Sequence, residues 1–236
     1  MVAAPIRLGG VRVFREALRY PLGGRRRLDG TLQCLASVLL AGGLLRLAEA
    51  LWPAWAAVVL AAAAAGPIVV FAGLVGGVLA DDGFPHPLTR RTARLGGRVL
   101  AVTGAYLLVP GLTILGVGYV TGVGAAAVGG GTVATLATVA LLLTVVCGYL
   151  LPAAAVVAVE KGVRSGLRRT AFRGTASGVY FLSWVGATVL VVLAWSLLAA
   201  TTPRSVAALL GVCAFAYAHV AAAALVARGV RRTRYW

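Results

Sequence analysis

Few side chains in the long apolar runs of this sequence could do chemistry there. His219 falls inside such a run, close to Tyr217 and Cys213. Arg46 and Glu49 stand three residues apart near the end of another run, a spacing that allows an ion pair on one helix face. An ionisable group within a membrane is a functional hypothesis by default. We therefore treat His219, Arg46 and Glu49 as a candidate intramembrane polar site. The structural alternatives are a histidine hydrogen-bonded between helices and an ion pair that snorkels to the interface.

Two carboxylates and a histidine lie close together after the second apolar run, at Asp81, Asp82 and His86. These side-chain types can bind a divalent cation, and at a membrane edge they would also suit a lipid-modifying enzyme. A turn that ends a helix explains the same residues, because glycine and proline stand among them. We favour the turn.

Signatures of the common enzyme classes are missing from the sequence. It contains no HExxH, GxSxG or P-loop motif. Its three cysteines, Cys34, Cys147 and Cys213, lie far apart within apolar runs and predict neither a disulfide nor a zinc site. We expect a protein that is not an enzyme and that holds no metal or other cofactor.

Composition places the chain among helical membrane proteins. Of its 236 residues, 61% are hydrophobic and 12% are charged, and the mean hydropathy is +0.95. Soluble domains are about half apolar and about a quarter charged. Several uncharged runs reach the roughly 20 residues that a helix needs to cross the ~30 Å hydrocarbon core of a bilayer. The sequence predicts an all-α, polytopic protein with a single integral membrane domain over 1–236.

Six transmembrane helices are expected, paired in chain order as three hairpins. Basic segments over 1–30 and 228–236 flank them, and the first span is expected to be an uncleaved anchor. The connection over 121–132 is rich in glycine and uncharged, which favours a loop on the outer side. The predicted spans cover approximately 31–51, 53–80, 99–120, 133–159, 179–200 and 206–227.

The distribution of positive charge predicts the orientation. The net charge is +16, and 20 of the 22 cations lie before the first span, after the last, or in the two connections that join successive hairpins. Arg46 and Arg204 are the exceptions. Because cytoplasmic loops carry the excess of Lys and Arg, we expect both termini to be cytoplasmic in a multi-pass protein of the cell membrane. In a soluble protein this charge would suggest nucleic acid; here we expect no nucleic acid and contact with anionic lipid.

Short basic segments precede the outgoing spans. Within 11–20 and 84–97, apolar residues and arginines fall on opposite faces at helical spacing, which predicts short amphipathic helices in the membrane interface. The segment 161–174 shows the pattern more weakly, because Gly162 and Gly166 lower its helix propensity. The three segments suggest an internal repeat, although any hairpin that leaves the cytoplasm begins with cations. The cations expected to contact lipid or a partner are Arg12, Arg15, Arg19, Arg90, Arg91, Arg94, Arg164, Arg168 and Arg169.

Five short motifs follow one another along the chain: ALRYP at 17–21, DDGFP at 81–85, YLLVPG at 106–111, YLLPAA at 149–154 and EKGVRSGLRRTAFR at 160–173. Together they resemble a haloarchaeal-type family of uncharacterised multi-span membrane proteins, defined only as a domain of unknown function. The resemblance covers nearly the whole chain. Because that family carries no established activity, the resemblance implies no catalytic residues.

The sequence favours a non-enzymatic scaffold or accessory subunit that contacts anionic lipid, a membrane-protein partner or a second copy of itself. A small-solute transporter or permease is the alternative, motivated by His219 and by Pro67, Pro110 and Pro152, which could break three of the spans. Coupled transporters usually need acidic residues in mid-membrane, and the middle of these six spans has none.

Overall fold

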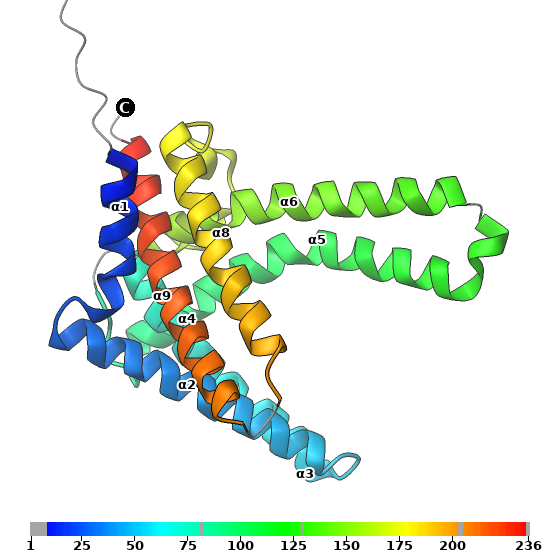
Figure 1. The fold of residues 1–236 in the computed structure, drawn as a ribbon, viewed down its shortest axis with the longest axis horizontal. Helices are drawn as coiled ribbons and strands as arrows, with labels where there is room; N and C mark the ends of the chain where they lie inside the picture. Colours follow the sequence, from blue (N-terminus) through cyan, green and yellow to red (C-terminus); the bar gives the residue numbers. More distant parts are fainter. Residues whose placement is uncertain (1–8, 81–82, 129, 203–204, 235–236) are drawn as a thin grey trace, which may run out of the picture.

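Long apolar runs with few helix breakers make the chain helical along most of its length. The computed structural model describes residues 9–80, 83–128, 130–202 and 205–234. Within these ranges no residue lies in a β-strand, and six helical segments are long and apolar enough to cross a membrane. The predicted fold class is confirmed: the protein is an all-α, multi-pass integral membrane protein (Figure 1).

The six membrane-crossing segments are α2, α3 together with α4, α5, α6, α8 and α9. Short helical pieces stand before and between them. In chain order the elements are α1 (Gly9–Leu18), the 3-10 helix η1 (Tyr20–Leu22), α2 (Arg25–Ala50), α3 (Trp55–Ala63), α4 (Ala65–Leu79), α5 (Arg90–Val128), α6 (Gly130–Lys161), α7 (Val163–Gly166), the 3-10 helix η2 (Arg169–Phe172), α8 (Gly178–Ala199) and α9 (Val206–Arg234).

Consecutive long helices pair as three antiparallel hairpins, α2 with α3–α4, α5 with α6, and α8 with α9 (Figure 1). In Figure 1 the α5–α6 hairpin projects away from the other two. The core lies where the hairpins meet, and there Leu74, Val156 and Val220 are fully buried. Farther out, leucines such as Leu115 and Leu193 are exposed. In a bilayer their exposure costs little, because lipid tails are as apolar as leucine.

The helices respond differently to their internal prolines. The second span is divided into α3 and α4 at Ala64. Pro67 accounts for this break, because it offers no N–H to the carbonyl of Ala63 and its ring clashes with that carbonyl. Pro110 and Pro152 lie inside α5 and α6, and both helices continue through them.

Glycines bring α4 and α5 into close contact. A Cβ atom added at Gly96 of α5 would lie 2.1 Å from the carbonyl oxygen of Val69. One added at Gly73 of α4 would lie 2.2 Å from the carbonyl oxygen of Thr92. Only glycine fits at these two positions, so the first and second hairpins pack backbone against backbone near the start of α5.

The amphipathic helix predicted near the N-terminus forms as α1, and part of its apolar face is covered by protein. Ala17 is 1% exposed, and the Phe14 ring lies against Gly186 of α8. The Tyr217 hydroxyl of α9 donates a hydrogen bond to the carbonyl oxygen of Leu18. The helix predicted over 11–20 is thus formed and packs partly on α8 and α9, while Phe14 stays 38% exposed. Its position in the membrane interface stays a prediction.

A separate short helix over 84–97 is not formed. Thr89 caps α5, because its hydroxyl oxygen accepts a hydrogen bond from the backbone N–H of Thr92 at 3.3 Å. The helix begins at Arg90 and runs to Val128 with no break. It also takes in much of the connection predicted over 121–132, and α6 begins at Gly130. No proline stands between Arg90 and Pro110 to separate a basic helix from the span.

The third basic segment, 161–174, is broken into α7 and η2. Gly162 and Gly174 have positive φ values of 98° and 87°, a conformation that only glycine adopts readily. The expected amphipathic helix is therefore replaced by two short turns of helix. The three segments share their charge but not their structure, and the internal repeat stays a prediction.

Candidate functional site

His219 lies within α9 and is held by neighbouring aromatic rings. Its Nδ1 atom is 2.8 Å from the carbonyl oxygen of Phe215, one turn earlier in the same helix. Its ring centroid is 4.1 Å from that of Phe215 and 5.8 Å from that of Phe71 on α4. These contacts are those of a packed, half-buried histidine that joins α9 to α4.

Arg46 and Glu49 form the ion pair that their spacing predicts. The Nη1 atom of Arg46 lies 2.8 Å from the Oε2 atom of Glu49, and their side chains are 67% and 70% exposed. His219 is not part of this pair. It lies seven residues beyond Val212, the last α9 residue to line the same pocket as the pair, which corresponds to about 10 Å along a helix axis. The structure thus brings together two of the three residues of the candidate polar site.

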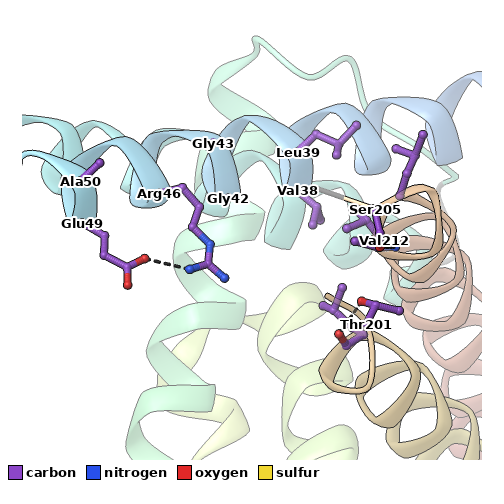
Figure 2. Close-up of a pocket in the computed structure, with 13 residues that line it drawn as sticks. Val38, Leu39, Gly42, Gly43, Arg46, Glu49, Ala50, Thr201, Ser205 and Val212 are labelled. Carbon is purple, nitrogen blue, oxygen red and sulfur yellow. Dashed lines mark hydrogen bonds and ion pairs between the residues drawn. The ribbon is translucent and has the colours of Figure 1, made fainter. Parts of the chain in front are cut away.

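The ion pair stands beside a lateral groove of about 950 Å³ between α2 and the turn that joins α8 to α9 (Figure 2). Most of its lining is apolar, with Val38 and Leu39 on one side and Leu209 and Val212 on the other. Gly42 and Gly43 also line it, and a Cβ added at either glycine would meet nothing within 4 Å. Sequence reasoning missed this groove, because it arises from the way two hairpins diverge.

The predicted lipid-contacting cations gather at one end of the bundle. Because the spans alternate in direction, the starts of α2, α5 and α8 and the end of α9 share this end, which we call the basic end. The side chain of Arg12 lies outside the described residues. The other eight predicted cations are all exposed: Arg15, Arg19, Arg90, Arg91, Arg94, Arg164, Arg168 and Arg169.

The basic end holds far more positive charge than the chain can neutralise. Among the described residues nineteen cations belong to it, against three carboxylates, Glu16, Asp29 and Glu160, since Glu49 lies at the opposite end. Summed charge of one sign raises the local potential and attracts ions of the other sign. The excess must therefore be balanced by something outside the chain.

Two of these cations tie helices together. Arg231 of α9 donates a hydrogen bond from Nη2 to the carbonyl oxygen of Leu79 at 2.6 Å, and its Nε atom lies 3.9 Å from Oε1 of Glu160 on α6. Arg98 donates from Nη1 to the carbonyl oxygen of Val159 at 2.9 Å. Sequence reasoning counted both arginines only as topology signals, and nothing in their local sequence distinguishes them.

Two further arginines flank an aromatic ring at the same end. The guanidinium carbons of Arg27 and Arg228 lie 4.4 Å and 5.9 Å from the ring centroid of Tyr20. A cation over an aromatic face is attracted by the ring quadrupole. The Nη1 atom of Arg228 is buried and has no hydrogen-bond partner among the described residues.

The cation site considered at Asp81, Asp82 and His86 cannot be assembled from what the structure describes, because Asp81 and Asp82 lie outside the described residues. His86 is exposed, and its carbonyl oxygen accepts a hydrogen bond from the Thr92 hydroxyl at 2.6 Å. Among the described residues, no group of three His, Cys, Asp or Glu side chains could hold a metal ion.

Comparison with known proteins gave no relative: no protein-family model, no curated protein and no solved structure matches this chain. The resemblance to the haloarchaeal-type family stays a prediction that rests on the short motifs alone.

Proposed function

We propose that the protein is a non-enzymatic membrane scaffold or accessory subunit whose basic end binds the anionic lipid of the cytoplasmic leaflet. One observation carries the proposal: among the described residues, the basic end gathers nineteen cations and only three carboxylates. The start of α2 and the end of α9 belong to that end, so we place both termini in the cytoplasm and the protein in the cell membrane.

The physical basis is the negative potential of an anionic leaflet. Each Lys or Arg near such a surface contributes about 1 kcal/mol of attraction, and the effect fades within a Debye length. That length is about 8 Å at physiological ionic strength. Exposed arginines such as Arg90 and Arg94, in the first turns of α5, stand where a span leaves the hydrocarbon and are within reach of lipid headgroups.

The hairpin arrangement favours a scaffold. The three hairpins pack tightly around buried residues such as Leu74 and Val156, and they diverge at the opposite end, where the groove beside Arg46 opens. Lipid bound at the basic end would hold the packed ends at the leaflet surface. The diverging ends would leave apolar faces for a membrane-protein partner or a second copy of the chain.

The test is the thermal stability of the protein in nanodiscs of neutral phosphatidylcholine into which anionic phosphatidylglycerol is introduced stepwise. The midpoint of unfolding should rise with the anionic fraction and fall back when salt is added. The double variant Arg90→Gln/Arg94→Gln should lose part of the rise, whereas Arg46→Gln, a cation at the opposite end, should keep it. A midpoint independent of lipid charge at low salt would refute the proposal.

A second candidate, a small-solute permease, is favoured by one observation. The groove of about 950 Å³ carries the Arg46–Glu49 pair beside an otherwise mostly apolar wall, and few polar groups on an apolar wall are typical of ligand sites. Solute uptake into proteoliposomes that Glu49→Gln abolishes would support the permease. Uptake equal to that of protein-free liposomes would remove it.

A further inference from the structure

A small pocket of about 250 Å³ lies at the basic end, between the end of α6 and the broken segment that contains α7 and η2. We propose that this pocket is a specific site for one phosphate group, and that the group belongs to the headgroup of an anionic lipid. This inference rests on the proposed function and deepens it, because it assigns one site within a generally basic surface. The lining residues are Val157, Lys161, Ser165, Arg168, Thr170 and Arg173.

Three cations converge on the pocket without a protein partner. The side chains of Lys161, Arg168 and Arg173 form no hydrogen bond or ion pair with any described residue. The adjacent carboxylate, Glu160, lies 3.9 Å from Arg231 of α9. Charge-assisted hydrogen bonds from arginine to phosphate are among the strongest in proteins, and they are frequently bidentate. The pocket thus offers three donors of the type that phosphate prefers.

The last turn of α6 would oppose an anion, because the carbonyl end of a helix carries partial negative charge. Three of the last four carbonyl oxygens already accept hydrogen bonds from other groups. Arg98 donates to Val159 at 2.9 Å, the N–H of Gly162 donates to Ala158 at 2.8 Å, and the Ser165 hydroxyl donates to Lys161 at 3.3 Å.

The fold holds the pocket in shape. Gly166 lies so close to α6 that an added Cβ would stand 2.7 Å from the carbonyl oxygen of Ala154. Ala171 of η2 is 4% exposed, and its N–H donates to the carbonyl oxygen of Arg168 at 2.9 Å. Both short helices are therefore anchored by their small residues. Arg168 and Thr170 project from an anchored backbone, and the Thr170 hydroxyl has no hydrogen-bond partner among the described residues.

The volume and position of the pocket fit a lipid phosphate. A water molecule occupies about 30 Å³ in the liquid, so 250 Å³ admits a phosphate group with a few waters. The floor is Val157, a buried residue in the last turns of a helix that crosses the membrane. A phosphate seated over Val157 would leave its acyl chains to run along α6 in the bilayer, whereas a soluble phosphate would gain nothing from that position.

The segment provides its own matched control. Arg164 and Arg169 belong to the same stretch and are exposed, but neither lines the pocket. The double variants Arg168→Gln/Arg173→Gln and Arg164→Gln/Arg169→Gln remove the same charge from the same segment. They differ only in whether the pocket loses two of its three cations.

The experiment is a titration of the full-length, delipidated protein in detergent with phosphatidic acid, followed by native mass spectrometry at high ionic strength, where the Debye length shrinks to a few ångströms. Wild type should bind one phosphatidic acid saturably. The pocket pair should lose affinity by roughly tenfold or more, and the control pair by no more than about twofold, because general attraction is screened while direct hydrogen bonds are not. Thr170→Val, which leaves the charge unchanged, should weaken binding severalfold and provides the test if the pocket pair does not fold.

Inorganic phosphate identifies the source of the group. Failure of inorganic phosphate to compete with phosphatidic acid supports a lipid headgroup, whereas competition that abolishes lipid binding overturns the lipid assignment. Equal losses in the two pairs, or binding by wild type that never saturates, would overturn the site while leaving the general attraction of the basic end intact. A failure of the proposed function would differ, because wild type would then show no dependence on anionic lipid in nanodiscs even at low salt.

Discussion

Arg98 on α5 donates a hydrogen bond from Nη1 to the carbonyl oxygen of Val159 on α6, over 2.9 Å. The last four carbonyls of a helix have no partner within it, and a cation near them also complements the helix dipole. This bond therefore closes the basic end of the α5–α6 hairpin. The neighbouring arginine Arg94 lies one turn earlier and is exposed.

Replacing Arg98 should lower stability more than replacing Arg94. Arg98→Gln leaves the Val159 carbonyl without its charged donor, a loss of about 1 to 3 kcal/mol. Arg94→Gln removes the same charge from an exposed site and should change stability by less than about 0.5 kcal/mol. The measurement is the midpoint of thermal unfolding in a neutral detergent, where lipid charge plays no part. Equal midpoints would show that the bond to Val159 does not hold the hairpin.

The glycines between α4 and α5 lead to a second prediction. Gly96→Ala places a methyl group 2.1 Å from the carbonyl oxygen of Val69, so the helices must move apart, at a cost of about 1 to 3 kcal/mol. Gly97→Ala adds the same methyl group where nothing lies within 4 Å and should be neutral or slightly stabilising. The same unfolding assay compares the two. A neutral Gly96→Ala would contradict the close packing of the first two hairpins.

Arg228 and Arg231 stand one turn apart on α9 and should respond in opposite directions to methionine. The Nη1 atom of Arg228 is buried without a partner among the described residues, so Arg228→Met removes an unsatisfied donor and should leave stability equal or higher. Arg231→Met breaks the bond to Leu79 and the contact with Glu160, and it should cost about 1 to 3 kcal/mol. A large loss of stability in Arg228→Met would mean that its guanidinium has a necessary partner.

The sequence allowed the spans and their pairing to be predicted, because membrane thickness and positive charge constrain them directly. It did not allow the local form of the basic segments to be predicted. The α1 helix is amphipathic by sequence, yet Ala17 packs on other helices, and the pattern alone does not say whether protein or lipid covers an apolar face. A separate helix over 84–97 is absent because Thr89 caps a helix that continues into the span without a break. The sequence did not show which residue would cap it.

The candidate sites were less predictable than the fold. The ion pair of Arg46 and Glu49 follows from a spacing within one helix, so sequence reasoning found it. The groove beside it and the pocket around Arg168 are formed by segments from different helices and require the tertiary arrangement. His219 was singled out for its chemistry, but its surroundings are the rings of Phe71 and Phe215, which no spacing rule could place there.

The central claim is that the basic end faces the anionic cytoplasmic leaflet, and cysteine labelling in intact cells tests it most directly. After the three native cysteines are replaced by alanine, Gly130→Cys reports the opposite end and Ala176→Cys the basic end; both positions are exposed. A membrane-impermeant maleimide should label the cysteine at 130 in intact cells and the one at 176 only after the cells are opened. Labelling at 176 in intact cells, with none at 130, would contradict the account.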